Sequence, residues 1–243
     1  MAGGLVDLAG LGHKMKAREL EVDMGLKIVL IACVIVVVAA AIIFAVSVFA
    51  QNAKSIKLLS PQMQNSKTLK EALQERKSGR EFSPRDLSLQ ELSDLLWAAC
   101  GVNRQDSGLR TAPSAMNLQE IDIYLAKKDG LFLYDAKKNI LKLVLPKDLR
   151  GLTGKQPFVS EAPIDFIYVA DFDRMTKLAS EEDKKLYSGT DTGFISQNVY
   201  LYCASAGLTT VVRGSLDREV LAKAMNLRPQ QKIILAQTVG YPK

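Results

Sequence analysis

Apolar and polar positions divide the chain into one long uncharged run and a following series of short patterned segments. Residues 28–50 carry no charged side chain at all. From residue 67 onward, apolar residues recur either with the spacing of an amphipathic helix or with the two-residue alternation of a strand. The pattern therefore predicts an apolar helix followed by a separate globular domain.

Helical spacing occurs in several parts of this domain, and two kinds of terminal signal support it. Ser88 and Glu91 form a capping box, in which the serine hydroxyl and the glutamate carboxylate each bind a free amide of the first turn. Gly101 and Gly207 stand just beyond the last apolar position of a helix, where glycine favours termination. The expected helices cover residues 68–77, 89–100, 174–187, 192–206 and 217–225.

Strand-like segments alternate with these helices. Residues 164–170 form a nearly continuous apolar run, which is typical of a central strand covered on both faces. Residues 131–134 and 140–144 flank a polar segment and predict a hairpin. Further strands are expected at residues 121–126, 208–213 and 233–240. The order of the elements predicts an α+β fold in which helices surround a mixed β-sheet.

Changes in composition define the domain organisation. We expect an N-terminal segment at 1–27, a hydrophobic helix outside the fold at 28–50, a polar tether at 51–66 and the folded domain at 67–243. A helix over residues 28–50 rises ~1.5 Å per residue and is long enough for a hydrocarbon core of ~30 Å. This segment is therefore either a transmembrane helix or the apolar region of a signal peptide.

The sequence leaves two alternatives for the apolar segment, cleavage and retention. Val48-Phe49-Ala50 before Gln51 resembles a signal-peptidase site, whereas the length of the run favours a retained anchor. Met15 and Met24 are alternative starts, and Leu30–Cys33 resembles a lipoprotein box but stands at the front of the run. Membrane-anchored and secreted forms both place the domain outside the cytoplasm, an orientation that the mixed charges before residue 28 support only weakly.

The available residue types limit the chemistry of the domain. The single histidine, His13, precedes the apolar run, so the domain has no Ser-His-Asp triad, Cys-His pair or His-ligated metal. No metal site is expected, because Cys100 and Cys203 lack metal-ligand spacing; we expect buried free thiols, with a disulfide as the alternative. The net charge of +6 comes without a stripe of Lys and Arg interleaved with aromatics, so no nucleic-acid partner is expected.

Two motifs carry candidate chemistry. The sequence Arg-Lys-Ser-Gly-Arg at 76–80 gathers three cations and a hydroxyl at the end of a helix, and guanidinium groups match phosphate oxygens. A solvated helix terminus, where cations are also favourable, is the alternative. The polar loop at 110–117, Arg-Thr-Ala-Pro-Ser-Ala-Met-Asn, offers donors and acceptors that suit the edge of a planar heterocycle. Together the motifs indicate a planar cofactor with a phosphate tail.

Taken in order, the motifs resemble those of the nitroreductase family of FMN flavoproteins, in particular the branch of oxidases that form thiazoles and oxazoles in peptides. The resemblance covers residues 67–243. The matching segments are 76–80, 89–99, 110–117, 197–198, 207–214 and 239–242. The resemblance implies a nitroreductase-like fold, bound FMN, and an intertwined homodimer with FMN at the interface.

The resemblance also implies roles for individual residues. The residues that would hold the FMN phosphate and ribityl chain are Arg76, Ser78 and Arg80. The residues that would contact the flavin ring and ribityl chain are Pro113, Ser114, Ala115 and Asn117. The segment that would serve the reaction by passing the flavin N5 edge is Val212, Arg213 and Gly214. A backbone amide at N5 stabilises the reduced flavin electrostatically.

The resemblance leaves two expectations about other cations. The Arg213 side chain has three possible partners, the flavin, the phosphate or a carboxylate, and cofactor contact is the preferred interpretation. Many relatives continue past the Gly-Tyr-Pro segment with a phosphate-binding arginine, whereas this sequence ends at Lys243. Phosphate binding is therefore expected to rest on Arg76 and Arg80, with Lys243 or Arg213 contributing.

The expected function is that of an FMN-dependent oxidoreductase that passes hydride or electrons through flavin N5 by a ping-pong mechanism. The resemblance implies a small-molecule substrate and an electron donor. NAD(P)H, a quinol and a protein are the alternatives for that donor. The alternatives are a non-catalytic, membrane-tethered flavin-binding or interaction module and a reductive dehalogenase on the same fold. The Tyr-Lys pair of the azoline-forming oxidases is not evident, which argues against peptide dehydrogenation.

Two further regions complete these expectations. Residues 179–190 are charged and contain Ser188-Gly189 as a candidate hinge, so they are predicted to form a substrate lid. Gln197, Asn198 and Tyr200 are candidates for dimer or flavin packing, with ordinary core packing as the alternative.

Overall fold

The computed structural model describes residues 38, 55–63, 67–178 and 180–243. The chain separates into two compact units, residues 1–54 and 55–243, and the fold described below is that of the second unit. The predicted N-terminal segment at 1–27 and the predicted apolar helix at 28–50 lie outside the described residues, apart from Val38. Among the residues that are described, no helix has the length and apolar character needed to cross a membrane.

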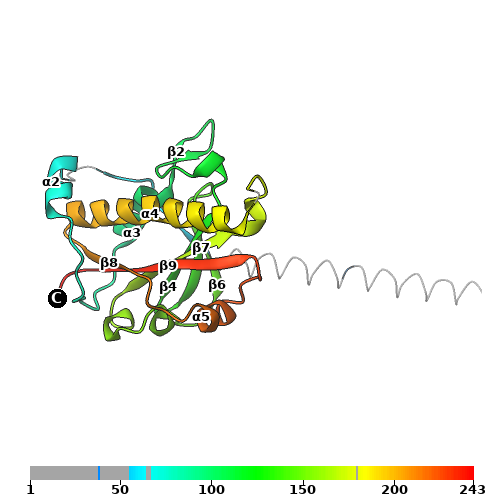
Figure 1. Cartoon of the computed structure of the whole chain (residues 1–243). Helices are drawn as coiled ribbons and strands as arrows, with labels where there is room; N and C mark the ends of the chain where they lie inside the picture. Colours follow the sequence, from blue (N-terminus) through cyan, green and yellow to red (C-terminus); the bar gives the residue numbers. More distant parts are fainter. Residues whose placement is uncertain (1–37, 39–54, 64–66, 179) are drawn as a thin grey trace, which may run out of the picture. The chain divides into compact units, whose positions relative to one another are not determined.

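The folded unit is built on a seven-stranded sheet with the order β1-β6-β5-β4-β7-β9-β8 (Figure 1). Its strands are β1 (Ser55–Lys57), β4 (Ile121–Lys127), β5 (Gly130–Asp135), β6 (Ile140–Leu145), β7 (Ile164–Asp171), β8 (Thr209–Arg213) and β9 (Gln231–Gly240). All neighbouring strands in it pair antiparallel. The prediction of a mixed sheet is therefore wrong. The alternation of apolar and polar residues along a strand does not indicate whether that strand runs parallel or antiparallel to its neighbour.

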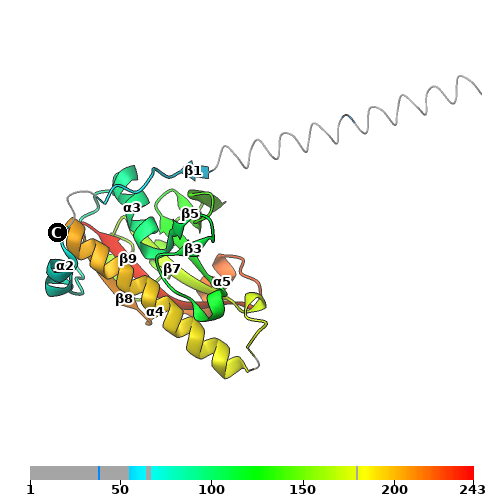
Figure 2. The ribbon, with the colours of Figure 1, turned by 90° about the horizontal axis from the view of Figure 1, so that it is seen from above.

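Helices cover both faces of the sheet, as Figures 1 and 2 show. The helices are α2 (Leu69–Glu75), α3 (Leu89–Cys100), α4 (Glu181–Ala206) and α5 (Arg218–Ala224). Leu95 of α3 and Val199 of α4 share a buried cluster with Phe166 of β7. Leu221 of α5 shares a second cluster with Ile167, the next residue along β7. Every residue of β7 is buried, which confirms the predicted central strand covered on both faces.

The terminal signals in the sequence are confirmed. The Ser88 hydroxyl accepts a hydrogen bond from the Glu91 amide, and the Glu91 carboxylate accepts one from the Ser88 amide, so the capping box starts α3. Gly101 caps the C-terminal end of α3. Gly207 ends α4 with φ = 69°, a left-handed conformation that favours glycine. Cys100 and Cys203 are free and buried, as expected.

The region expected to contain two helices and a hinged lid is organised differently. Phe172–Arg174 forms a 3-10 turn, and a single helix then runs from Glu181 to Ala206. Ser188 and Gly189 lie inside this helix, so the predicted hinge and the predicted separate lid are wrong. Ser188 and Asp191 are buried against the domain, and this packing outweighs the cost of about 1 kcal/mol for a glycine in a helix. Residue 179 lies outside the described residues.

The expected tether at 51–66 is in part a strand of the fold. Ser55–Lys57 pairs with β6, and Leu58 is buried directly after it. The Leu59 amide donates to Ser93 Oγ at 2.9 Å, which fixes the segment along α3. The folded unit therefore begins at residue 55 rather than 67. The polar composition of residues 51–66 suggested a solvated segment. Composition does not reveal this strand, because its stabilising contacts are made largely by the main chain.

Another element that the pattern did not indicate is a small sheet before the 110–117 loop. It consists of β2 (Val102–Arg104) and β3 (Leu109–Arg110), which pair antiparallel. The Thr111 amide donates to the Gly101 carbonyl oxygen at 2.9 Å, so the loop starts from a fixed point at the end of α3.

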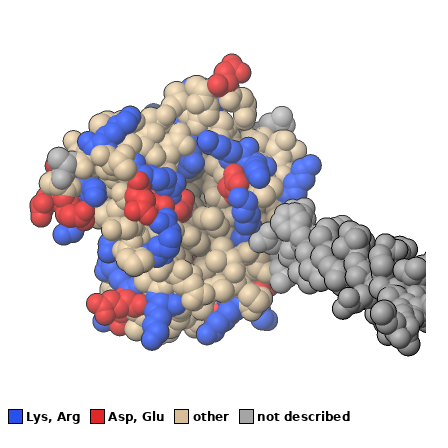
Figure 3. Space-filling model, turned by 90° about the vertical axis from the view of Figure 1, so that its right-hand side faces the viewer, with Lys and Arg blue, Asp and Glu red and all other residues tan. Residues whose placement is uncertain are grey.

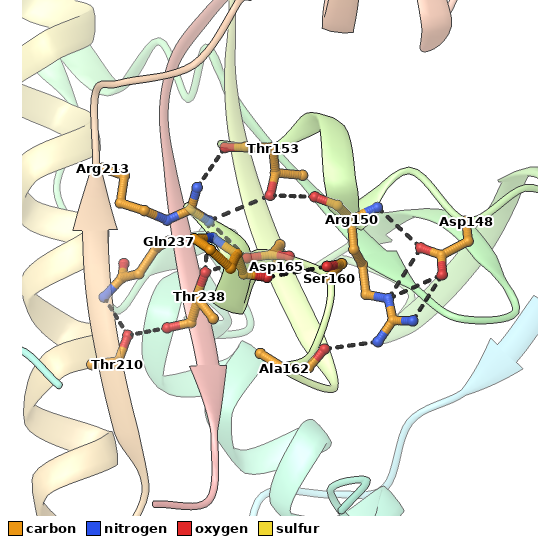
Figure 4. A network of polar contacts seen from close by, with 11 residues as sticks. Asp148, Arg150, Thr153, Ser160, Ala162, Asp165, Thr210, Arg213, Gln237 and Thr238 are labelled. Carbon is orange, nitrogen blue, oxygen red and sulfur yellow. Dashed lines mark hydrogen bonds and ion pairs between the residues drawn. The ribbon is translucent and has the colours of Figure 1, made fainter. Parts of the chain in front are cut away.

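A buried ion pair joins three neighbouring strands of the sheet (Figure 4). Arg213 Nη2 of β8 lies 2.7 Å from Asp165 Oδ1 of β7 and 2.6 Å from Thr238 Oγ1 of β9. Nη1 donates to the Thr153 carbonyl oxygen at 2.6 Å. The exposed fractions of the two charged side chains are 4% and 0%. A Cβ atom at Gly154 would lie 2.0 Å from Nη1, so the guanidinium position requires glycine there.

This arrangement corrects the preferred interpretation of the Arg213 side chain. Its guanidinium pairs with a carboxylate inside the domain, which was the third alternative, and does not point toward a cofactor position at the surface. Burial raises the pKa of Asp165, and the Arg213 charge and the Thr238 hydroxyl oppose that rise. The pair therefore stabilises the charged carboxylate at the junction of β7, β8 and β9.

We expect Arg213→Met to lower the free energy of unfolding by about 3–5 kcal/mol, because it leaves Asp165 buried without its cation. The loss should grow as the pH rises above about 7, since the wild type then ionises Asp165 beside Arg213 whereas the folded variant, without the cation, retains the proton. Urea unfolding at several pH values measures both effects. Lys142→Met removes a partly exposed ion pair with Asp135 and should cost less than about 1 kcal/mol. Equal stability of the two variants would contradict the assignment.

Candidate functional site

The turn at 76–80 lies flat against strand β8. The Gly79 amide donates to the Thr210 carbonyl oxygen at 3.0 Å. A Cβ atom at Gly79 would lie 1.9 Å from Thr209 Oγ1, so the backbones approach this closely only because residue 79 has no side chain. The basic turn is therefore fixed to the sheet by its own backbone rather than left as a solvated helix end.

The Tyr200 hydroxyl connects this turn to the middle of β8. Tyr200 is buried on α4, and its hydroxyl lies 2.8 Å from Ser78 Oγ. The same hydroxyl accepts a hydrogen bond from the Val212 amide at 3.0 Å. The Arg76 guanidinium stands over the Tyr200 ring, 5.2 Å from its centroid. One side chain thus brings together the predicted phosphate-binding turn and the predicted N5 segment.

The cations of the turn are available for an anion. Arg76 is half-buried, Lys77 and Arg80 are exposed, and within the described part of the chain none of the three forms a salt bridge. A hollow of about 230 Å³ lies beside the turn, and its walls include Lys77, Tyr200 and Thr209. Arg76, Ser78 and Arg80 do not line this hollow, but they stand in the same turn, and guanidinium groups and a hydroxyl are suited to binding a phosphate.

Lys243 lies beyond this hollow rather than in its wall. Pro242 bridges to Phe82, two residues after Arg80. Lys243 itself lines a second, larger hollow of about 550 Å³, together with Arg150 and Lys128. The structure thus places Lys243 near the end of the basic turn but facing a different depression.

The loop that carries Pro113, Ser114, Ala115 and Asn117 contacts a different part of α4. The Ala115 amide donates to Asp191 Oδ2 at 2.8 Å, and Ser114 Oγ accepts a hydrogen bond from the Gln119 amide at 3.0 Å. Ala115–Asn117 forms a 3-10 turn in which Asn117 has φ = 53°. These contacts fix the loop at its backbone and leave Ser114 engaged within the loop.

The two groups of predicted site residues are separate within one chain. The basic turn and the end of β8 meet at Tyr200, whereas the loop is bound at Asp191. At a rise of ~1.5 Å per residue, these two positions lie ~13 Å apart along α4. The structure therefore brings Arg76, Ser78 and Val212 together and presents the loop as a second cluster.

The other two candidates on α4 lie away from the basic turn. Asn198 Nδ2 donates to the Ala99 carbonyl oxygen at 3.4 Å and so helps join α4 to α3. Gln197 is exposed. Of the three candidates on this helix, only Tyr200 contacts the site.

Sequence reasoning missed two buried carboxyl groups behind the loop, Glu120 and Asp191. A signal for one of them was present. Asp191 is the only charged residue between Thr190 and the end of the helix at Ala206. A single acid in an otherwise uncharged stretch of a packed helix indicates a specific partner, because burying a lone carboxylate is costly.

Charge is dispersed on one face of the domain. On the face drawn in Figure 3, Lys and Arg side chains are spread among Asp, Glu and uncharged residues and do not form one continuous stripe. The local excess of cations in the 76–80 turn is therefore a feature of that segment and not a consequence of the general basic charge of +6.

Comparison with known proteins identifies relatives of this fold and site. A model of the nitroreductase family matches residues 73–241. The Methanocaldococcus jannaschii protein named "Putative nitroreductase MJ1384" is 32% identical over 163 residues, covering 63% of this chain and 81% of that protein. A crystal structure from Ralstonia eutropha JMP134, of a protein with the same description, has 43% identity and a TM-score of 0.75, with 78% of this chain and 90% of that chain covered.

A more distant structure shares the fold. The NADPH:FMN oxidoreductase of Vibrio harveyi, solved as a complex with NAD+, has a TM-score of 0.55 at 19% identity, over 72% of this chain and 69% of that chain. The match of the family model to most of residues 55–243, the 32% and 43% identical relatives and the α+β architecture agree. This chain belongs to the nitroreductase family of oxidoreductases.

Proposed function

We propose that this protein is an FMN-dependent oxidoreductase whose phosphate-binding turn is residues 76–80. The observation that carries the proposal is the set of unpaired cations and a hydroxyl fixed beside β8 through Gly79 and Tyr200. A dianionic phosphate would satisfy Arg76, Ser78 and Arg80 together, and guanidinium groups bind phosphate oxygens through paired hydrogen bonds. The residues present therefore fit the phosphate end of FMN.

FMN, when bound, supplies the hydride and electron chemistry at its N5 position. The protein binds and orients it. The backbone of Val212, Arg213 and Gly214 would lie along the flavin ring. The hydrogen bond from the Val212 amide to the Tyr200 hydroxyl would fix the position of that backbone relative to the 76–80 turn. The loop at 113–117 would contact the ring and ribityl chain. The guanidinium of Arg213 would act from inside the sheet, by fixing β8, rather than by touching the cofactor.

The reaction we propose is a ping-pong transfer in which a donor leaves before a small-molecule acceptor binds. A distant neighbour of the same fold is an NADPH:FMN oxidoreductase, which supports a nicotinamide donor here. A quinol or a protein donor would better suit a domain outside the cytoplasm, which remains the prediction from residues 28–50. Membership of the azole-forming branch also remains a prediction from the sequence motifs alone.

We further propose that the protein acts as a homodimer. Helices α2 and α4 expose apolar side chains, with exposed fractions of 66% for Leu69, 54% for Leu73, 44% for Phe194 and 63% for Leu186. A second copy that covers these side chains would remove apolar surface from water. Pairing of two chains would also allow the 113–117 loop of one copy to complete the site at the 76–80 turn of the other, since the two clusters are separate within one chain.

The first prediction concerns the phosphate turn. Full-length protein should be yellow, absorb between 300 and 550 nm, and release FMN on heating. Arg76→Ala should weaken FMN binding by roughly 10- to 100-fold, because it removes charged hydrogen bonds worth about 1.5–3 kcal/mol. Lys70→Ala, at an exposed position of α2 outside the turn and outside the wall of the hollow, should change the dissociation constant less than about threefold. Fluorescence titration of the protein with FMN measures both.

A colourless protein that cannot be reconstituted with FMN would overturn the proposed function. Reduction of the bound flavin by NAD(P)H or a quinol, followed by reoxidation by an added acceptor, would separate an enzyme from a flavin-binding module without turnover. Bound FMN that no donor reduces would leave only the binding role.

The second prediction concerns Tyr200. Tyr200→Phe removes the hydroxyl that joins Ser78 to the Val212 amide, so it should weaken FMN binding by roughly 3- to 10-fold, about 1 kcal/mol. Tyr187→Phe makes the same change at a partly exposed position of the same helix and should leave FMN affinity unchanged. Equal FMN affinity of the two variants would show that Tyr200 does not connect the turn to the strand.

A further inference from the structure

The chain that leaves the basic turn at 76–80 is attached to the fold a second time, shortly after Arg80. The first attachment is the hydrogen bond of the Gly79 amide to strand β8. In the second, the Ser83 amide donates to the Tyr241 carbonyl oxygen at 2.9 Å. Tyr241 directly follows β9, so Arg80 lies between two backbone attachments to neighbouring strands of the sheet.

The second attachment is buried and apolar. Phe82 is 1% exposed, bridges to Pro242 and lies with its ring centroid 5.4 Å from that of Phe158. It shares a small buried cluster with Val211 of β8. The Arg80 side chain is exposed, whereas the main chain on both sides of it is held against the sheet.

The side chain of Tyr241 is itself held at the start of α3. Its hydroxyl donates to Glu91 Oε1, and Glu91 Oε2 accepts the Ser88 amide at 2.8 Å in the capping box. Burial opposes ionisation of Glu91, but the hydrogen bonds from Ser88 and Tyr241 outweigh it and lower the pKa of that carboxyl. Tyr241 therefore donates to a charged carboxylate, which makes a strong hydrogen bond.

The Tyr241 ring also contacts the chain that follows the turn. The Arg85 guanidinium carbon lies 4.0 Å from the ring centroid, within the range of a cation–π interaction. Ser83 contacts Tyr241 through the main chain and Arg85 contacts it through the side chain. One residue thus joins the segment after the basic turn to the carboxylate of Glu91 at the start of α3.

We propose that Tyr241 is a positioning residue for Arg80, because it holds the chain after the basic turn and so fixes where Arg80 meets the phosphate of FMN. Arg76 does not need this support, since its guanidinium lies over the Tyr200 ring on α4. A turn that is already held loses less conformational freedom when a ligand binds. The inference rests on the proposed function for its link to FMN, whereas the attachment by Tyr241 is a property of the protein alone.

Fluorescence titration of full-length protein with FMN tests the link to Arg80. Tyr241→Ala should raise the FMN dissociation constant by roughly 3- to 10-fold. In Arg80→Ala the same substitution should add less than about twofold, because two residues that act as a unit are not additive. In Arg76→Ala it should still add roughly 3- to 10-fold. Equal effects in both backgrounds, or no effect in the wild type, would overturn the proposal.

Hydrogen exchange followed by NMR, without FMN, tests the attachment itself. Tyr241→Ala should lower the protection factor of the Ser83 amide by roughly 3- to 10-fold. The Gly79 amide is the internal control, because it donates to β8 and should keep its protection. An equal loss at both amides would show a general loosening of the domain and would contradict a role for Tyr241 in positioning.

Tyr241→Phe decides the question if Tyr241→Ala does not fold. It keeps the ring beside Arg85 and removes only the hydrogen bond to Glu91. Protection of the Ser83 amide should fall by at least about twofold, with Gly79 unchanged, and no change at Ser83 would overturn the proposal. A wild type that binds no FMN would instead overturn the proposed function, and the exchange result would stand.

Discussion

The continuous helix α4 is the constraint on which the arrangement of the site depends. One end of its buried stretch holds the Ala115 amide through Asp191, and the other holds Ser78 and Val212 through Tyr200. Because an α-helix has a fixed rise per residue, these two attachment points cannot change their separation without breaking the helix. The packing of α4 against α3 and the sheet therefore sets where the turn, the strand and the loop lie relative to one another.

The domain accommodates buried acids in two chemically different ways. Asp165 is matched by a cation, Arg213, and by the Thr238 hydroxyl, and the result joins three strands rigidly. Among the described residues, neither oxygen of the buried Glu120 carboxyl group has a hydrogen-bond partner, whereas Asp191 accepts the Ala115 amide. The Arg213 guanidinium remains protonated across the physiological pH range, so Asp165 always has a cation beside it. Asp191 stands beside the 113–117 loop rather than within the sheet.

Much of the fold was predictable because its signals are local. The capping box of Ser88 and Glu91, the glycine after Ala206 and the apolar run of β7 each act over a few residues, and each has the predicted structure. The basic turn was also recognisable, since its residue types are unusual together. The continuity of α4 past Gly189 was not predictable, because it depends on the burial of Ser188 and Asp191 against elements distant in sequence.

The sequence by itself determined the types of most elements, the family motifs and the absence of histidine from the folded unit, because these depend on residue identity and short-range spacing. The tertiary structure alone decided which charges are paired. It turned the Arg213 side chain inward to Asp165, connected Ser78 to Val212 through Tyr200, and joined the Ala115 amide to Asp191. The physical reason is that hydrogen bonds and ion pairs form between groups that chain folding brings within about 3 Å, and residue spacing along the sequence does not contain that distance.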